Sequence, residues 1–74
     1  MNERTTHDPN IMGGKPCVRG TRVTVGTVLG LLATKTPLER ILAAYPYLEA
    51  DDIDACLEYA AWRMKKRDVA LVAT

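Results

Sequence analysis

The sequence predicts a small, mainly α-helical domain in which three helices follow a short extended arm. Apolar residues recur at helical spacing in three segments, at about residues 25–34, 36–45 and 50–66. The stretch 13–25 holds three of the five glycines together with Pro16, a composition typical of turns and extended chain. The gap between the first two helices is only about two residues, which forces a sharp change of direction, as in helix-turn-helix units.

The length and composition limit the classes of protein that are compatible with the chain. Its 74 residues suffice for one domain with a marginal core, so we expect association with a second copy to stabilise it. Cys17 and Cys56, with the single histidine His7, form neither a metal-ligand pattern nor a disulfide framework. No segment resembles a signal peptide or a membrane span. We therefore expect a cytoplasmic protein with reduced thiols and with no metal or cofactor.

We expect residues 1–74 to form a single domain with four parts. These parts are a disordered start at 1–5, a β-arm at 6–23, a three-helix unit at 24–66 and a C-terminal tail at 67–74. The tail is apolar for a terminus, so it is either a fraying helix end or a segment that orders on a partner. We expect the extended segments at about residues 4–23 to pair across two chains of a homodimer, because their edges need partners.

Glycines and a proline shape the arm. Gly13–Gly14 predicts a turn, and Pro16 favours extended chain at a strand edge. Gly20 separates two short extended runs and indicates a bulge, so Arg19 and Arg22 need not share a face. Because Arg22 lies nearer the first helix, we assign it to bracing the arm against the acidic third helix, and Arg19 to phosphate contact. The alternative is a purely structural arm, in which arginines hold only backbone carbonyls.

The first two helices are predicted by caps and by apolar stripes. Thr24 is a suitable N-cap for a first helix from Val25 to Thr34. Thr36 and Glu39, on either side of Pro37, predict a capping box for the second helix, which ends before Pro46. The predicted apolar stripes are Val25, Val28, Leu29 and Leu32 on the first helix, and Leu38, Ile41, Leu42 and Tyr45 on the second.

The third helix is predicted from Ala50 to Lys66, with acidic residues at its start and basic residues at its end. The expected buried stripe is Ile53, Cys56, Leu57, Ala60 and Met64, whereas Asp52, Asp54 and Glu58 are expected to face outward. Tyr47 and Leu48 precede this helix among acidic neighbours. That context favours a hydrophobic plug over the helix junction rather than a base-stacking platform, which normally has basic residues interleaved.

The formal charge is arranged in three blocks. Residues 1–35 carry +3, residues 36–62 carry −5 and residues 63–74 carry +3, although the whole chain carries only +1. Two basic blocks could bind nucleic acid, or they could neutralise the acidic block within a dimer. No nucleophile–base pair, phosphate-binding loop or metal cluster is recognisable, so the sequence gives no indication of an enzyme.

The segment DPNIMGGKPCVRGTRVTV, followed by LLATKTPLERILAAYPYLEADDIDACLEYAA, resembles the DUF433 family of small prokaryotic proteins. The resemblance extends from about Thr6 to Trp62. It implies a winged or homeodomain-like helix-turn-helix fold with an N-terminal β-arm, and an antitoxin that is encoded beside a PIN-like toxin. The chain departs from the family pattern at two helix boundaries. Lys35 replaces a usual glycine after the first helix, and Glu49 replaces a frequent threonine before the last one.

Two functions follow as expectations. The first is an antitoxin that neutralises a PIN-like ribonuclease and binds its own promoter DNA as a dimer. The second is a protein-interaction module that does not bind DNA. The residues expected to contact DNA are Lys15, Arg19, Arg22, Arg40 and Arg63, and those expected to contact a protein partner are Asp68, Val69, Leu71 and Val72. Acidic residues at the start of the third helix repel phosphate, so we expect the arm to make the main DNA contacts.

Overall fold

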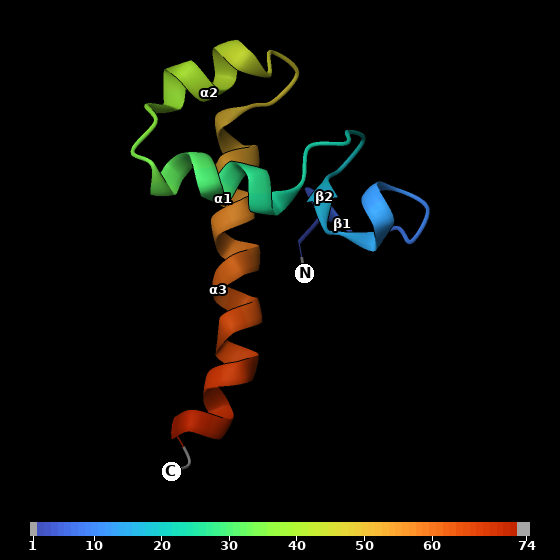
Figure 1. Cartoon of the computed structure of the whole chain (residues 1–74), viewed down its shortest axis with the longest axis vertical. Coiled ribbons are helices and arrows are strands. Elements are labelled where there is room, and N and C mark those ends of the chain that lie inside the picture. Colours follow the sequence, from blue (N-terminus) through green and yellow to red (C-terminus); the bar gives the residue numbers. More distant parts are fainter. Residues whose placement is uncertain (1, 73–74) are drawn as a thin grey trace.

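The computed structural model in Figure 1 describes the backbone of residues 2–72 and the side chains of residues 2–65. It confirms the predicted class, since three helices and a small antiparallel sheet make up the domain. In chain order the elements are β1 (Thr5–Thr6), a 3₁₀ turn (Met12–Gly14), β2 (Cys17–Val18), α1 (Val25–Ala33), α2 (Leu38–Ala44) and α3 (Ala50–Val72). Helix α1 packs against both α2 and α3, and β1 packs against α3.

Both ends of α1 are fixed by hydrogen bonds. The Thr24 side chain accepts a bond from the Thr27 amide at 3.0 Å, so the predicted N-cap is confirmed. At the other end the Lys35 amide donates to the Leu32 carbonyl at 3.0 Å, and the Thr36 amide donates to the Leu31 carbonyl at 3.1 Å. This pair of bonds is a Schellman motif, and it places Lys35 in the left-handed region with φ of 63°.

The capping box predicted at Thr36 is wrong. The N-cap of α2 is Pro37, without a side-chain cap, and the Thr36 hydroxyl lies 3.1 Å from that of Thr34. The physical reason is competition, because the Schellman motif of α1 already holds the backbone of Thr36. A reciprocal capping bond occurs at α3 instead, where the Glu49 amide donates to the carboxylate of Asp52, the third residue of that helix, at 2.8 Å.

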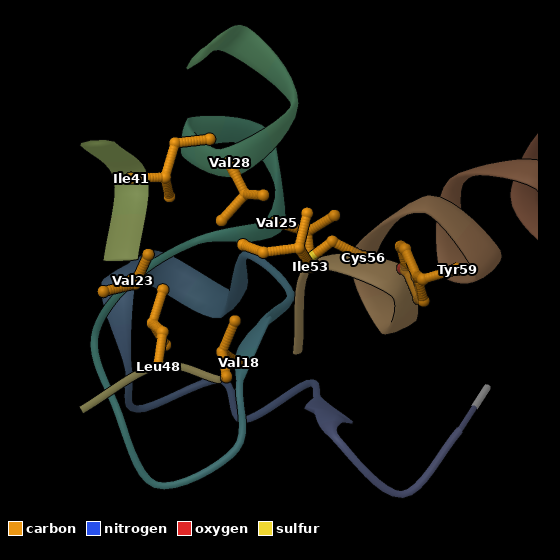
Figure 2. Packing of buried hydrophobic residues seen from close by; sticks show 9 residues of the cluster. All are labelled: Val18, Val23, Val25, Val28, Ile41, Leu48, Ile53, Cys56 and Tyr59. Carbon is orange, nitrogen blue, oxygen red and sulfur yellow. The ribbon is translucent and has the colours of Figure 1, made fainter. Parts of the chain in front are cut away.

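Nine buried residues form one core between the arm, α1, α2 and the first half of α3, as Figure 2 shows. Ile41 is only 1 % exposed, whereas Leu42 is half-buried at the edge of the core. The prediction that Leu57 and Met64 are buried is wrong, since both are exposed, while Tyr59 is buried. For Met64 the reason is the length of α3, whose second half extends beyond the other elements in Figure 1. Leu57 lies about 160° around the helix axis from the buried Tyr59, so it faces away from the core. The nine residues are Val18, Val23, Val25, Val28, Ile41, Leu48, Ile53, Cys56 and Tyr59.

The expected disorder at residues 1–5 is wrong for the described residues 2–5. Strand β1 pairs with β2 within the chain, in the register Thr5↔Val18. The Asn2 side chain donates a hydrogen bond to the Ala55 carbonyl of α3 at 3.0 Å. The start of the chain is therefore tied both to the arm and to α3. Pairing of two arms across a dimer stays a prediction.

Helix α3 does not end at Lys66 as predicted, since its backbone is helical to Val72. The segment 67–72 therefore continues the helix instead of forming a separate tail. The side chains expected to contact a partner belong to Asp68, Val69, Leu71 and Val72, and they lie outside the described side chains.

Candidate nucleic-acid interface

A shallow groove of about 510 Å³ brings two arginines of the arm to an exposed tyrosine of the α2–α3 connection. Its lining residues are Arg19, Gly20, Thr21, Arg22 and Tyr47. Four of them are consecutive in the loop after β2, and the fifth comes from a segment distant in sequence. The groove therefore exists only in the folded chain.

The arm loop is a rigid turn. The Thr21 amide donates to the Val18 carbonyl at 3.0 Å, and Gly20 has the φ of 78° that the third position of a type II turn requires. The Thr21 hydroxyl donates to the Val18 carbonyl at 2.8 Å and accepts a bond from the Val23 amide at 3.0 Å. Because the backbone is held on both sides, Arg19 and Arg22 project from fixed positions.

Tyr47 is also held in place. Its ring packs edge-to-face against Tyr45, with centroids 6.3 Å apart and an interplanar angle of 71°. The next residue, Leu48, is buried in the core, while Tyr47 is 61 % exposed. The predicted hydrophobic plug is thus right for Leu48 and wrong for Tyr47. An exposed, oriented aromatic ring in a groove that two arginines also line is suited to sugar and base contacts.

The prediction that Arg22 braces the arm is wrong, and the contact with phosphate stays a prediction for both arginines. The Arg19 guanidinium donates to the Glu3 carbonyl at 3.2 Å, so this residue braces the arm. Arg22 is exposed and makes no hydrogen bond or ion pair with residues 2–65. The cation available for an external anion is therefore Arg22. Arg19 remains exposed and can contribute charge while it holds the arm.

Arg4 neutralises the acidic start of α3. Its guanidinium contacts Asp52 at 2.9 Å, Glu49 at 3.2 Å and Asp51 at 3.7 Å. The hydrogen bonds to Asp52 and then to Glu49 raise the pKa of Arg4 above its ordinary value. Asp52 is only 7 % exposed, so the expectation that it faces outward is wrong. Because Arg4 balances part of this charge, the repulsion of phosphate expected near Tyr47 is reduced.

The other cations predicted to contact DNA do not line the groove. Lys15 is exposed just after the 3₁₀ turn, Arg40 is exposed on α2, and Arg63 is exposed on α3. Arg63 lies about 20 Å along the helix axis from Ala50, at 1.5 Å per residue. Sequence reasoning missed Tyr47 and Arg4, because in each case the decisive neighbour comes from a distant segment.

Two features bear on the chemistry of the described residues: the distribution of metal-ligating side chains and the buried thiol of Cys56. No three His, Cys, Asp or Glu side chains among residues 2–65 gather in a way that could hold a metal ion. Burial, with a smaller contribution from the charge of Asp52, raises the pKa of the Cys56 thiol to about 11. This thiol is protonated at neutral pH and is a poor nucleophile. Within the described part of the chain, no helix has both the length and the apolar character that a bilayer crossing requires.

Comparison with known proteins places this arm-and-helix arrangement in a family. The family described as "Protein of unknown function (DUF433)" matches residues 6–60, which include the arm, the groove and the first half of α3. The chain belongs to the DUF433 family. The predicted resemblance is therefore confirmed.

Two similar proteins show how far the likeness extends. The uncharacterized protein y4eO of Sinorhizobium fredii (strain NBRC 101917 / NGR234) is 45 % identical over 58 residues, which are 78 % of this chain and 26 % of that protein. This chain thus spans about a quarter of its length. The crystal structure of a DUF433 member from Anabaena variabilis ATCC 29413 superposes with a TM-score of 0.78 at 28 % identity, over 93 % of this chain and 68 % of the other.

Proposed function

We propose that this DUF433 protein is a cytoplasmic, antitoxin-like regulator that binds duplex DNA upstream of its own gene and neutralises a PIN-like ribonuclease. The observation that supports DNA binding is the groove that Arg19, Arg22 and the exposed Tyr47 line together. These are residue types that contact phosphates and sugars, and such contacts fix a protein on the duplex.

Each residue of the groove has a distinct part in this proposal. Arg22 is exposed and unpaired within residues 2–65, so it is available to a phosphate without losing an internal contact. Arg19 adds positive charge while its bond to the Glu3 carbonyl keeps the loop in position. Tyr47 supplies a hydroxyl donor for the same strand, and Tyr45 limits its movement. Binding of this kind depends on the DNA backbone and therefore on salt.

Titration of labelled duplex from upstream of the gene tests this function at several salt concentrations. For the native protein, log affinity should fall with log salt by about 0.9 for each phosphate contact. Arg22→Ala should weaken binding and reduce that slope by about one unit. Tyr47→Phe should cause a smaller loss, because only the hydroxyl is removed. Arg63→Ala is the matched control, since Arg63 is an exposed arginine outside the groove.

The outcomes separate the two expected functions. If Arg63→Ala weakens binding as much as Arg22→Ala does, the interface lies elsewhere on the chain. If the native protein shows no salt-dependent binding, the protein-interaction module without DNA binding is the better description. The exposed apolar residues Leu57 and Met64 on α3 favour that alternative.

Neutralisation of the toxin is tested separately. We assign it to the end of α3, where Asp68, Val69, Leu71 and Val72 would dock into a groove of the nuclease as a helix. Addition of the native protein should abolish RNA cleavage by a PIN-like protein encoded beside it. A chain that ends after Lys65 should lose this effect and keep DNA binding. Inhibition by the shortened chain would contradict the assignment.

A further inference from the structure

Helix α3 carries an exposed apolar row beyond the core. Leu57, Ala61 and Met64 are exposed and follow one another at intervals of four and three residues, so they lie on one side of the helix. Leu57 is 47 % exposed and Met64 is 51 % exposed. Figure 1 shows that the second half of α3 extends past α1 and the arm.

Charged residues border the row on one side, and their signs change along the helix. Asp54 and Glu58 lie toward the start of α3 and Lys65 lies further along; all three are exposed. At 100° per residue they fall within about 40° of one another around the helix axis. Among residues 2–65 the acidic residues that form ion pairs are Glu49, Asp51 and Asp52, all with Arg4. Asp54 and Glu58 line a hollow together with Arg4 but form no ion pair with it.

This pattern is complementary to itself when one helix is reversed. In an antiparallel pair of identical helices, the side of one helix that carries Glu58 and Lys65 lies beside the same side of the other helix. Because the helices run in opposite directions, the acidic part of one then faces the basic part of the other. With the two-fold axis close to Ala61, Leu57 lies opposite Met64 of the second copy, and Glu58 lies beside Lys65. The small side chain of Ala61 permits close approach at the axis. The helix dipoles also oppose one another favourably.

We propose that Leu57, Ala61 and Met64 form the seam of an antiparallel homodimer made by α3 of two copies. The partner is a second copy of this chain, because the charge pattern along the seam matches its own reverse. A parallel pair would place Glu58 and Lys65 on opposite sides of the interface and leave the charges unpaired. This dimer does not depend on DNA binding, and it differs from one made by paired arms.

Sedimentation equilibrium of the full chain tests the seam. The native protein should give a dimer mass at micromolar concentration, and Met64→Glu should raise the dissociation constant at least about tenfold, as expected for a charge in an apolar seam. Met12→Glu is the matched control, since Met12 is an exposed methionine on the arm. Circular dichroism should show unchanged helix content in both variants. A native monomer, or dissociation caused by Met12→Glu alone, would overturn the proposal.

Charge reversal tests the direction of the helices. Glu58→Lys and Lys65→Glu should each weaken the dimer by about fivefold or more, because each creates two like-charge contacts across the two-fold axis. The double variant should return to within about threefold of the native dissociation constant. A double variant weaker than either single variant would exclude the antiparallel seam.

Cysteine cross-linking provides a second measure of direction. A mixture of Leu57→Cys and Met64→Cys chains should form mixed disulfide dimers on oxidation, whereas Leu57→Cys alone should not. The native thiols Cys17 and Cys56 are buried and provide little background. Efficient cross-linking of Leu57→Cys with itself would indicate a parallel pair and contradict the proposed dimer.

Discussion

Replacement of Lys35 by glycine should stabilise the protein. Lys35 closes the Schellman motif of α1 with φ of 63°, a region that costs an L-residue about 1–2 kcal/mol. Glycine adopts this conformation freely but loses about 0.5–1 kcal/mol more backbone entropy on folding. The side chain of Lys35 is exposed, so its removal leaves no cavity. We therefore expect Lys35→Gly to raise the free energy of unfolding by about 0.5–1 kcal/mol.

Urea titration and thermal melting measure this change. In a domain of this size a gain of about 1 kcal/mol raises the melting temperature by about 4–8 °C. Lys35→Ala is the control, because it removes the charge and long side chain but keeps a Cβ in the left-handed region. Its stability should stay close to that of the native chain. If Lys35→Gly and Lys35→Ala behave alike, the backbone conformation at this position is not the source of strain.

Three further predictions concern the core and the start of α3. Ile41→Ala should cost about 2–5 kcal/mol, and Leu42→Ala clearly less, when both are measured by urea unfolding. Asp52→Ala should lower the free energy of unfolding by about 1–3 kcal/mol, because the Glu49 amide and a guanidinium lose their acceptor. Asp52→Asn should lie in between. Burial raises the pKa of the Cys56 thiol from 9.0 to about 11, so the thiol ionises at lower pH in the unfolded chain than in the folded one. The free energy of unfolding should therefore fall as pH rises from about 9 to about 11. Cys56→Ala should not show this part of the pH-dependent fall.

Local sequence patterns predicted the helices well, because their signals lie within a few residues. The Thr24 cap and the stripe of α1 depend on neighbours three or four positions away, which the sequence shows directly. The capping box at Thr36 failed because another local motif competed for the same backbone. That motif was hard to foresee, since it has Lys35 at a position where glycine is usual.

The candidate site was harder to predict, because long-range contacts decide it. Tyr47 has acidic neighbours in sequence, yet in the fold its groove is lined by Arg19 and Arg22 of the arm. Residues 2–5 look like a polar, untethered terminus. Their order comes from the pairing of Thr5 with Val18 and from contacts with α3, neither of which a sequence pattern reveals.

The acidic residues of the block 36–62 fall into two groups that have different partners. Arg4 forms ion pairs with Glu49, Asp51 and Asp52. These pairs reduce the negative charge beside Tyr47 that would repel a phosphate. Asp54 and Glu58 are left one to two turns further along α3. In the proposed dimer the cation beside Glu58 is Lys65 on the reversed helix of the second copy. A charge-balanced chain can therefore present a cationic groove and a self-complementary seam together, because each part of its acidic block has a separate partner.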